Sequence, residues 1–249
     1  MSQATQKMIT KPREMTDAYR KMVITLMDRQ ASREISTSEV FGQCLQFAPT
    51  VEDKLRLLRF AGEEVRHFKA IADLMAELGV DIDAYLKNRL PAGSRFTHDP
   101  ANEQIHDWIE ATLFNFFIDR AATFQLSEYV KGTYEPLARA NRSIVAEEEG
   151  HQNFGEACLL ELCKDPAVRA QFQARLKTWF VGAMRIFGRA GTPGNRYCLE
   201  VGLKTRDSGE IAAAWLDDVR PVLKRAGLRL PRREELDIDV PPQCNLSMG

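Results

Sequence analysis

Two stretches with the same pattern decide the fold: "EEVRH" at residues 63–67 and "EEEGH" at residues 147–151. In each, two adjacent glutamates precede a histidine, and the second glutamate lies three residues before it. On a helix this spacing places both side chains on one face, about one turn apart. Helix bundles use two such pairs, together with a carboxylate from each of two other helices, to bind two metal ions. The repeat therefore predicts a helix bundle with a dimetal site.

The composition is that of a soluble globular protein. Of the 249 residues 44% are hydrophobic and 28% are charged, and the net charge of −1 provides no general attraction to nucleic acid or anionic membranes. The N-terminal "MSQATQKMITKPREM" has no apolar core, and no apolar stretch is long enough for a membrane span. The five cysteines form no CxxC pair, which argues against a disulfide framework. We expect a cytoplasmic protein without signal peptide, membrane span or nucleic-acid partner.

Helical periodicity dominates the chain, and no strand pattern is evident. We predict helices at about 14–47, 51–78, 102–130 and 135–163, a fifth from about 165 and a sixth within 207–227. Their expected boundaries are Thr50 and Asp165 as N-terminal caps and Gly79 after a helix end. The segments 90–100 and 188–196 are predicted loops. The fold class is therefore all-α: a four-helix core at about 14–163 and extra helices at about 165–230 in one domain (1–230), followed by a Pro-rich extended tail (231–249).

The position of the first turn predicts which carboxylate of the first helix joins the site. Pro49 lies halfway in sequence between Glu34 and Glu64, so on antiparallel helices joined near Pro49 these two residues lie at the same height. Glu39, the competing acid, is five residues away and therefore about 7.5 Å out of plane. We predict Glu34 as the ligand from the first helix.

The same count applies to the third and fourth helices. The midpoint between Asp119 and Glu148 falls at residues 132–133, in a predicted turn, whereas Glu128 is displaced along the axis. Exposed surface charge is the alternative for each acid, and Asp119 in particular has Arg120 and Arg139 as candidate ion-pair partners. The predicted catalytic and metal-binding residues are Glu34, Glu64, His67, Asp119, Glu148 and His151.

The first glutamate of each pair has a different expected role. Glu63 and Glu147 are rotated by about 100° from the ligand glutamates. Each is placed to accept the free ring N–H of a histidine on the neighbouring helix, which would hold that ring in position. The alternative is that both face solvent.

Four carboxylates and two imidazoles favour iron or manganese. Two divalent ions would balance the four negative charges, and open positions on such a pair can bind O2. Four phenylalanines surround Asp119 in the sequence, where they would line an apolar pocket that excludes water; the alternative is that they are core residues. These are Phe114, Phe116, Phe117 and Phe124.

With these ligand boxes, "EEVRHF" and "EEEGHQNFG", and the C-terminal "RIFGRAG…YCLEVGLKTRDSGEIAAAWLDDVRPVLKRAGLRLP", the chain resembles the catalytic subunits of phenylacetyl-CoA and benzoyl-CoA epoxidases. The resemblance spans roughly residues 14–231 and implies a ferritin-like bundle with two iron ions. It also implies an enzyme that activates O2 and inserts one oxygen atom into an aromatic ring carried as an acyl-CoA thioester. Glu34, Glu64 and His67 would hold one side of the diiron centre, and Asp119, Glu148 and His151 the other.

The resemblance further implies partners. Electrons would come from an external reductase with a flavin and an iron–sulfur cluster, and a homologous non-catalytic subunit or a second copy of the chain is the expected protein partner. Candidate cations for the CoA phosphates, with a solvated basic face as the alternative, are Arg185, Arg189, Arg196, Lys204 and Arg206. Two other functions stay open: an iron-handling ferroxidase, and a diiron hydroxylase of a non-CoA substrate such as a tRNA base.

Overall fold

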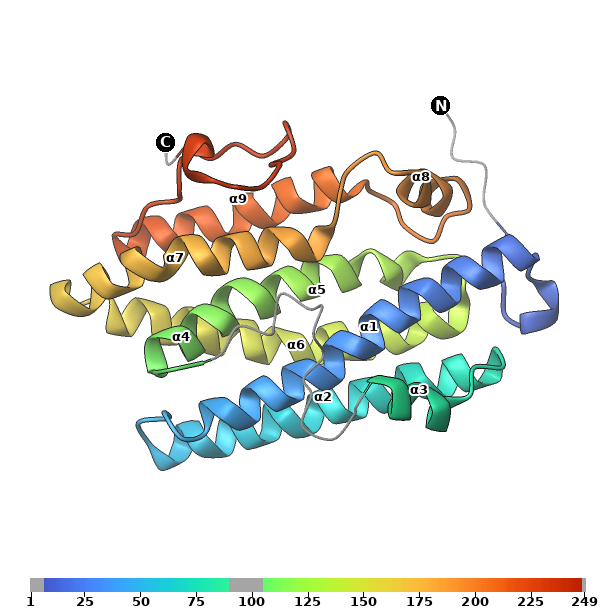
Figure 1. Cartoon of the computed structure of the whole chain (residues 1–249), viewed down its shortest axis with the longest axis horizontal. Helices are drawn as coiled ribbons and strands as arrows, with labels where there is room; N and C mark the ends of the chain where they lie inside the picture. The colour runs from blue at the N-terminus through green and yellow to red at the C-terminus, as the bar shows by residue number, and fades with distance from the viewer. Residues whose placement is uncertain (1–6, 90–104, 248–249) are drawn as a thin grey trace.

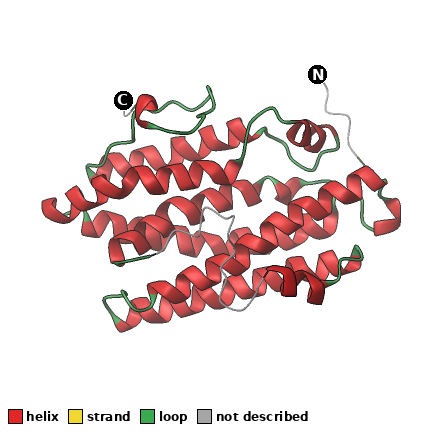
Figure 2. Ribbon diagram, in the orientation of Figure 1, coloured by secondary structure: helices red, strands yellow, loops and turns green. Residues whose placement is uncertain are grey.

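The computed structural model describes residues 7–89 and 105–247, and it is helical throughout, without a β-strand in either range (Figure 2). The predicted loop at 90–100 lies outside the described residues. The long helices are α1 (Asp17–Cys44), α2 (Val51–Glu77), α6 (Glu135–Leu162), α7 (Pro166–Phe187) and α9 (Ser208–Ala226). The shorter ones are α3 (Ile82–Arg89), α4 (Trp108–Leu113), α5 (Arg120–Ser127) and α8 (Pro193–Glu200). The all-α prediction is confirmed.

Four helical segments form the bundle that carries the ligand boxes. α1 and α2 pack as an antiparallel hairpin, and α6 contacts both α2 and the α4–α5 segment. α7 and α9 pack on α5, on the side away from the α1–α2 hairpin (Figure 1). This is the architecture of a ferritin-like bundle with additional C-terminal helices.

The predicted helix boundaries depend on local chemistry, and the structure confirms them. The Thr50 side chain accepts a hydrogen bond from the backbone N–H of Asp53 at the start of α2, and Asp165 accepts from Ala167 and Val168 at the start of α7. Gly79 follows α2 with a positive φ of 81°, a conformation that glycine adopts without steric cost. These boundaries fix where each helix begins and ends, and hence the position of each side chain along the axis of the bundle.

The third bundle helix is not continuous, contrary to the prediction of one helix at 102–130. Between α4 and α5 the chain forms a π-helical segment, η3 (Phe114–Asp119), and a short 3₁₀ turn (Tyr129–Lys131) follows α5. A π-helix inserts an extra residue into the turn, and such segments often occur at functional sites. Asp119 is the last residue of η3, so the distortion sets the direction of its side chain.

The backbone of η3 lies against α6 at a glycine. A Cβ atom on Gly155 would lie 2.9 Å from the Cβ of Asn115 and 2.9 Å from the backbone nitrogen of Phe116. Such short distances exclude any side chain at this position. Gly155 therefore allows η3 to approach the helix that carries the second ligand box.

Two short helices differ from the sequence-based expectation. α3 follows α2 directly, and α8 begins at Pro193, within the segment predicted as a loop at 188–196. Thr192 caps α8 by accepting a hydrogen bond from the backbone N–H of Asn195, and proline at the first helical position suits its start. A cap followed by proline was the available signal, but eight residues are too few for a clear periodicity.

The chain after Leu230 packs against the helices. It contains a 3₁₀ turn (Arg233–Glu235), and it buries Val240 and Cys244 in the larger hydrophobic cluster of the protein. All five cysteines are free thiols, so the prediction of no disulfide framework is confirmed. Among the described residues, every helix is too short or too polar to cross a membrane.

Candidate metal centre

The structure brings the six predicted ligands together at one height in the bundle. Glu34 comes from α1, Glu64 and His67 from α2, Asp119 from η3, and Glu148 and His151 from α6. None of these side chains is more than 5% exposed, although four are acids. Buried acids without a compensating charge are unfavourable, and a cluster of this kind could hold a cation.

The six residues form two overlapping groups of four, each with one potential ligand atom per residue within 4.8 Å of the others. One group contains Glu34 and His67, and the other contains Asp119 and His151. Glu64 and Glu148 belong to both. The sequence-based expectation divided the ligands three and three, whereas in the structure Glu64 and Glu148 each have atoms close enough for both groups.

The Nδ1 atoms of both histidines face the carboxylates. In His151, Nδ1 lies 3.1 Å from Glu148 Oε2, 3.3 Å from Glu64 Oε1 and 3.4 Å from Asp119 Oδ2. In His67, Nδ1 lies 3.3 Å from Glu148 Oε1. The same nitrogen of each ring therefore points to the centre of the cluster.

Several of these atoms are buried without any hydrogen-bond partner: Glu64 Oε1, His67 Nδ1, Asp119 Oδ2, Glu148 Oε2 and His151 Nδ1. A buried polar group without a partner costs about 1–3 kcal/mol. Five such atoms in one place, all of oxygen or imidazole type, fit a pair of hard divalent ions. The residues present therefore match the dimetal centre that the repeat predicts.

The cluster perturbs the acidity of its own members. Burial, reinforced by the charge of Glu148, raises the pKa of Asp119 to about 6 and that of Glu64 well above its usual range. Burial also opposes ionisation of Glu148, but the two neighbouring imidazoles outweigh it and lower its pKa to about 2. Burial likewise opposes protonation of His67, yet Glu148 and Glu34 raise its pKa to about 11. The protonation states of the cluster members therefore depend on one another, and together these residues could hold a cation.

The outer nitrogen of each histidine is held by the first glutamate of the other box. Nε2 of His151 lies 2.9 Å from Glu63 Oε2, and Nε2 of His67 lies 3.2 Å from Glu147 Oε2. The prediction that these two acids bind histidines across the α2–α6 contact is confirmed. With Nε2–H donating outward, each ring in its neutral form would present a lone pair on Nδ1 to the carboxylate cluster.

Gln30, a residue without a role assigned from the sequence, holds Glu34 and is itself held by Asn141. Nε2 of Gln30 donates to Glu34 Oε1 at 2.9 Å and to Asn141 Oδ1 at 2.9 Å, and both amides are buried. Gln30 lies one turn before Glu34 on the buried face of α1. A polar side chain at such a position was the signal that could have identified it.

The acids considered as alternative ligands, and the arginines considered as ion-pair partners of Asp119, make other contacts. Glu39 is exposed, and Glu128 accepts hydrogen bonds from the backbone and side chains of Thr205 and Arg206. Arg120 forms ion pairs with Glu156 at 2.7 Å and Asp218 at 2.5 Å, not with Asp119. Arg139 lies 3.8 Å from Glu135. The ion-pair alternative for Asp119 is thus not observed.

The phenylalanines near Asp119 belong mainly to the core. Phe114, Phe116 and Phe117 are fully buried, and Phe124 packs against the same cluster. Phe114 packs edge-on against Phe41, which in turn contacts His151. These rings keep one side of the site apolar.

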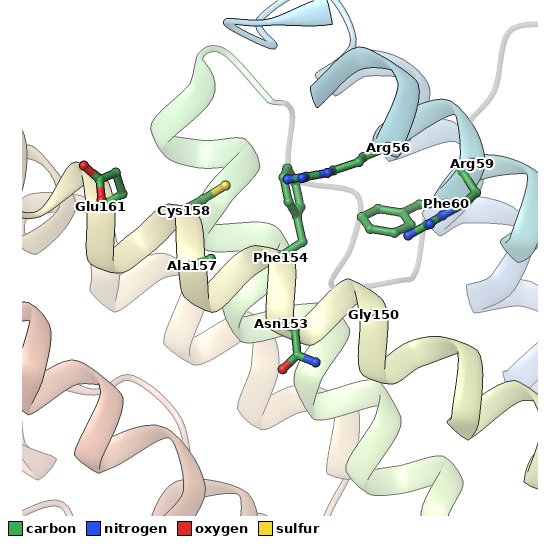
Figure 3. A pocket seen from close by; sticks show the side chains of 9 residues that line it. All are labelled: Arg56, Arg59, Phe60, Gly150, Asn153, Phe154, Ala157, Cys158 and Glu161. Atoms are coloured by element: carbon green, nitrogen blue, oxygen red, sulfur yellow. The ribbon is translucent and has the colours of Figure 1, made fainter. Parts of the chain in front are cut away.

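A cavity of about 500 Å³ lies between α2 and α6, and the phenylalanines near Asp119 do not line it (Figure 3). Its wall includes Phe60, whose ring centroid is 4.1 Å from that of His151, and Phe154. The guanidinium of Arg59 lies over the Phe60 ring and that of Arg56 over the Phe154 ring, as Figure 3 shows. Phe60 therefore separates the cavity from the histidine.

The five basic residues considered for CoA phosphates differ in burial and in their contacts. Lys204 is buried and donates to Asn195, and Arg206 is paired with Glu128 at 2.7 Å. Arg196 donates to the backbone carbonyl of Gly191, and Arg185 and Arg189 are exposed. Lys204 is thus buried away from the surface, whereas Arg206 is partly exposed beside Glu128, and the phosphate site stays a prediction.

A helix bundle that gathers four buried carboxylates and two histidines from four helical segments defines the class of ferritin-like carboxylate proteins. Within this class the chain belongs to the family described as "Phenylacetic acid catabolic protein", which matches residues 1–239. It is 24% identical over 220 residues to a subunit of the Escherichia coli (strain K12) 1,2-phenylacetyl-CoA epoxidase, covering 87% of this chain and 71% of that protein. It is 28% identical over 152 residues to the Aromatoleum evansii "Benzoyl-CoA oxygenase component B", covering 59% of this chain and 31% of that protein.

Proposed function

We propose that this protein is a diiron monooxygenase that inserts one oxygen atom from O2 into a small activated substrate, an aromatic acyl-CoA thioester. The observation that carries the proposal is the pair of overlapping ligand groups that share Glu64 and Glu148. An iron pair at this position would supply O2 activation and oxygen-atom transfer. The names of the two relatives, one an epoxidase of an aromatic acyl-CoA and the other a benzoyl-CoA oxygenase, support the substrate class.

The proposed ligands are held by their surroundings before any metal binds. Glu34 is fixed by Gln30, and the two histidine rings are fixed by Glu63 and Glu147. Rigid placement of this kind lowers the cost of assembling a coordination sphere. These residues would position both metal ions without further rearrangement of the helices.

Water exclusion is the second contribution of the chain. Phe41 and Phe60 pack on the imidazole of His151, with ring centroids 5.4 and 4.1 Å from it. Rings at this distance leave no room for water on that side of the ligand. A site that admits O2 and limits water protects reactive oxygen species from wasteful reduction.

Electrons for the proposed reaction would come from a protein partner. An external reductase with a flavin and an iron–sulfur cluster is the proposed donor, and O2 is the co-substrate. Both relatives carry names of parts of larger enzymes, which supports a multi-component enzyme.

The test is a single-turnover reaction with ¹⁸O₂. The protein is loaded with Fe(II) without O2, exposed to ¹⁸O₂ with a panel of aryl- and alkyl-CoA esters, and analysed by mass spectrometry. A product that carries one ¹⁸O atom is expected with an aryl-CoA and not with the Glu64→Ala protein. Oxidation of iron with every ester unchanged would contradict the proposal and favour an iron-handling role.

A further inference from the structure

An apolar stripe runs along the outer face of α2. Four of the five exposed large hydrophobic residues among the described part of the chain lie on this helix: Val51 (67% exposed), Leu55 (61%), Leu58 (54%) and Val65 (47%). With Gly62 they recur at intervals of four, three, four and three residues, the spacing of a helix face that packs on another helix. The stripe spans about 21 Å at 1.5 Å per residue.

No segment of the described chain covers this stripe. α2 packs on α1, α6 and α3 through its other faces, and it forms an outer edge of the bundle (Figure 1). A contiguous apolar surface of this kind usually marks an interaction site, whereas isolated exposed apolar residues are ordinary.

The stripe is complementary to itself in an antiparallel arrangement. When two copies of α2 cross with Leu58 opposite Leu58, Val51 lies opposite Val65 of the second copy. Leu55 then lies opposite Ala61 of the second copy and one residue, about 1.5 Å, from the level of Gly62, so a leucine side chain faces two small residues. Opposition of large and small residues is what close helix packing requires.

The charges beside the stripe match in the same register. Glu52 and Arg66 flank it on the same side and are both exposed, and in the antiparallel pair each lies two residues, about 3 Å, from the level of the other residue of the second copy. Both flanking cations on this side also contact acids of their own chain: Arg59 lies 3.6 Å from Glu63, and Arg66 lies 3.2 Å from Glu147. Across a two-fold axis, Glu52 would come within reach of Arg66 of the second copy twice and would add a second acid to the one that Arg66 already contacts, Glu147.

Gly62 provides an independent indication. A glycine within a helix lowers helix stability relative to alanine. The nearest atom to a Cβ at this position is Arg66 Nη1 at 4.0 Å, so nothing within the described chain requires glycine here. A close approach by another chain would require it.

We propose that the α2 face formed by Val51, Leu55, Leu58, Gly62 and Val65 is a homodimer interface, occupied by α2 of a second copy in antiparallel orientation. The proposal concerns association alone and does not depend on the proposed oxygenase activity. It has one consequence for the metal centre. Glu147, 42% exposed and bound to His67 and Arg66, lies beside this face, so the second copy would limit the access of water to it.

Sedimentation equilibrium of the full chain, from low micromolar to several hundred micromolar, tests the proposal. We expect a monomer–dimer equilibrium for the unmodified protein and a dissociation constant at least about tenfold higher for the Leu58→Glu protein, as for central residues of interfaces. The Met8→Glu protein, which changes the other exposed large apolar residue (47% exposed), is the matched control and should dimerise normally. A monomer at all concentrations, or a dimer that Leu58→Glu leaves intact, would overturn the proposal.

Two further variants separate association from folding and establish the orientation. Gly62→Leu should raise the unfolding free energy of the monomer, because leucine favours helix, while weakening the dimer by filling the gap that Leu55 needs. In an equal mixture of the Val51→Cys and Val65→Cys proteins, mild oxidation should link unlike copies in preference to like ones. Preferential linking of like copies would indicate a parallel pair and overturn the antiparallel arrangement.

Discussion

Nε2 of His151 on α6 lies 2.9 Å from Oε2 of Glu63 on α2, and the mirror contact joins His67 on α2 to Glu147 on α6. The two boxes thus support each other: the second glutamate and the histidine of each box face the buried carboxylate cluster, and the first glutamate holds the histidine of the other box. These reciprocal contacts explain why each ligand box contains two adjacent glutamates.

The reciprocal contact predicts a specific loss of metal affinity. Glu63→Ala should lower the affinity for Fe(II) by about 10- to 100-fold, because the His151 ring loses the acceptor that fixes its orientation. Competition with a chelator under anaerobic conditions measures this affinity. Glu149→Ala removes an exposed acid from the same part of α6 and should leave it unchanged. Equal affinities for both variants would contradict the role of Glu63.

The sharing of Glu64 and Glu148 predicts two different stoichiometries. Glu34 belongs to one ligand group, so Glu34→Ala should still bind one metal ion per chain. Glu64 belongs to both, so Glu64→Ala should bind neither tightly while remaining a folded helical protein. Elemental analysis after gel filtration gives the metal content, and circular dichroism checks the fold. Two ions per chain in the Glu64→Ala protein would exclude the six-ligand arrangement.

The close approach of η3 to α6 at Gly155 predicts that a larger residue at this position lowers the stability of the protein. Gly155→Ala should lower the unfolding free energy by about 1–3 kcal/mol, because the methyl group would overlap the backbone of η3. Gly150→Ala on the same helix is the control: the nearest atom to its Cβ would be Arg59 Nη2 at 3.9 Å, and alanine should stabilise by up to about 1 kcal/mol. Urea unfolding measures both. Opposite signs are expected, and a stabilising Gly155→Ala would refute the packing argument.

Glu128 predicts a pH-dependent contribution to stability. Burial alone would raise its pKa, but hydrogen bonds from Thr205 and Arg206 and the charge of Arg206 outweigh this, and the pKa is lowered. A carboxyl group whose pKa is lower in the folded state stabilises the protein above its unfolded pKa, about 4.3, and this contribution disappears as the pH falls through the folded value.

Glu128→Gln should therefore cost about 2 kcal/mol at neutral pH and progressively less below about pH 4. Urea unfolding at a series of pH values measures the difference from the unmodified protein. Glu39→Gln, at an exposed acid, is the control and should show little change at any pH. A cost that is independent of pH would show that the carboxylate charge of Glu128 is not what binds the 205–206 segment.

The sequence was sufficient to predict the four-helix core and the six clustered residues. An α-helix rises by a constant 1.5 Å per residue, so counting outward from the turns at Pro49 and at 132–133 places Glu34 level with Glu64 and Asp119 level with Glu148. The three-residue spacing of each box then determines that glutamate and histidine share a face. Both arguments use local geometry, which the order of residues determines.

Other features depend on tertiary packing. Counting residues gives the position of a side chain along its helix, but it does not say which neighbour each carboxylate oxygen faces. The membership of Glu64 and Glu148 in both ligand groups therefore follows from how the helices pack. Gln30 and Asn141 are 111 residues apart, and their hydrogen bond exists because α1 and α6 lie side by side. The π-helical turn that ends at Asp119 likewise has no periodic signature in sequence. Folding sets these relationships because burial leaves each polar group few partners, and the partners come from distant parts of the chain.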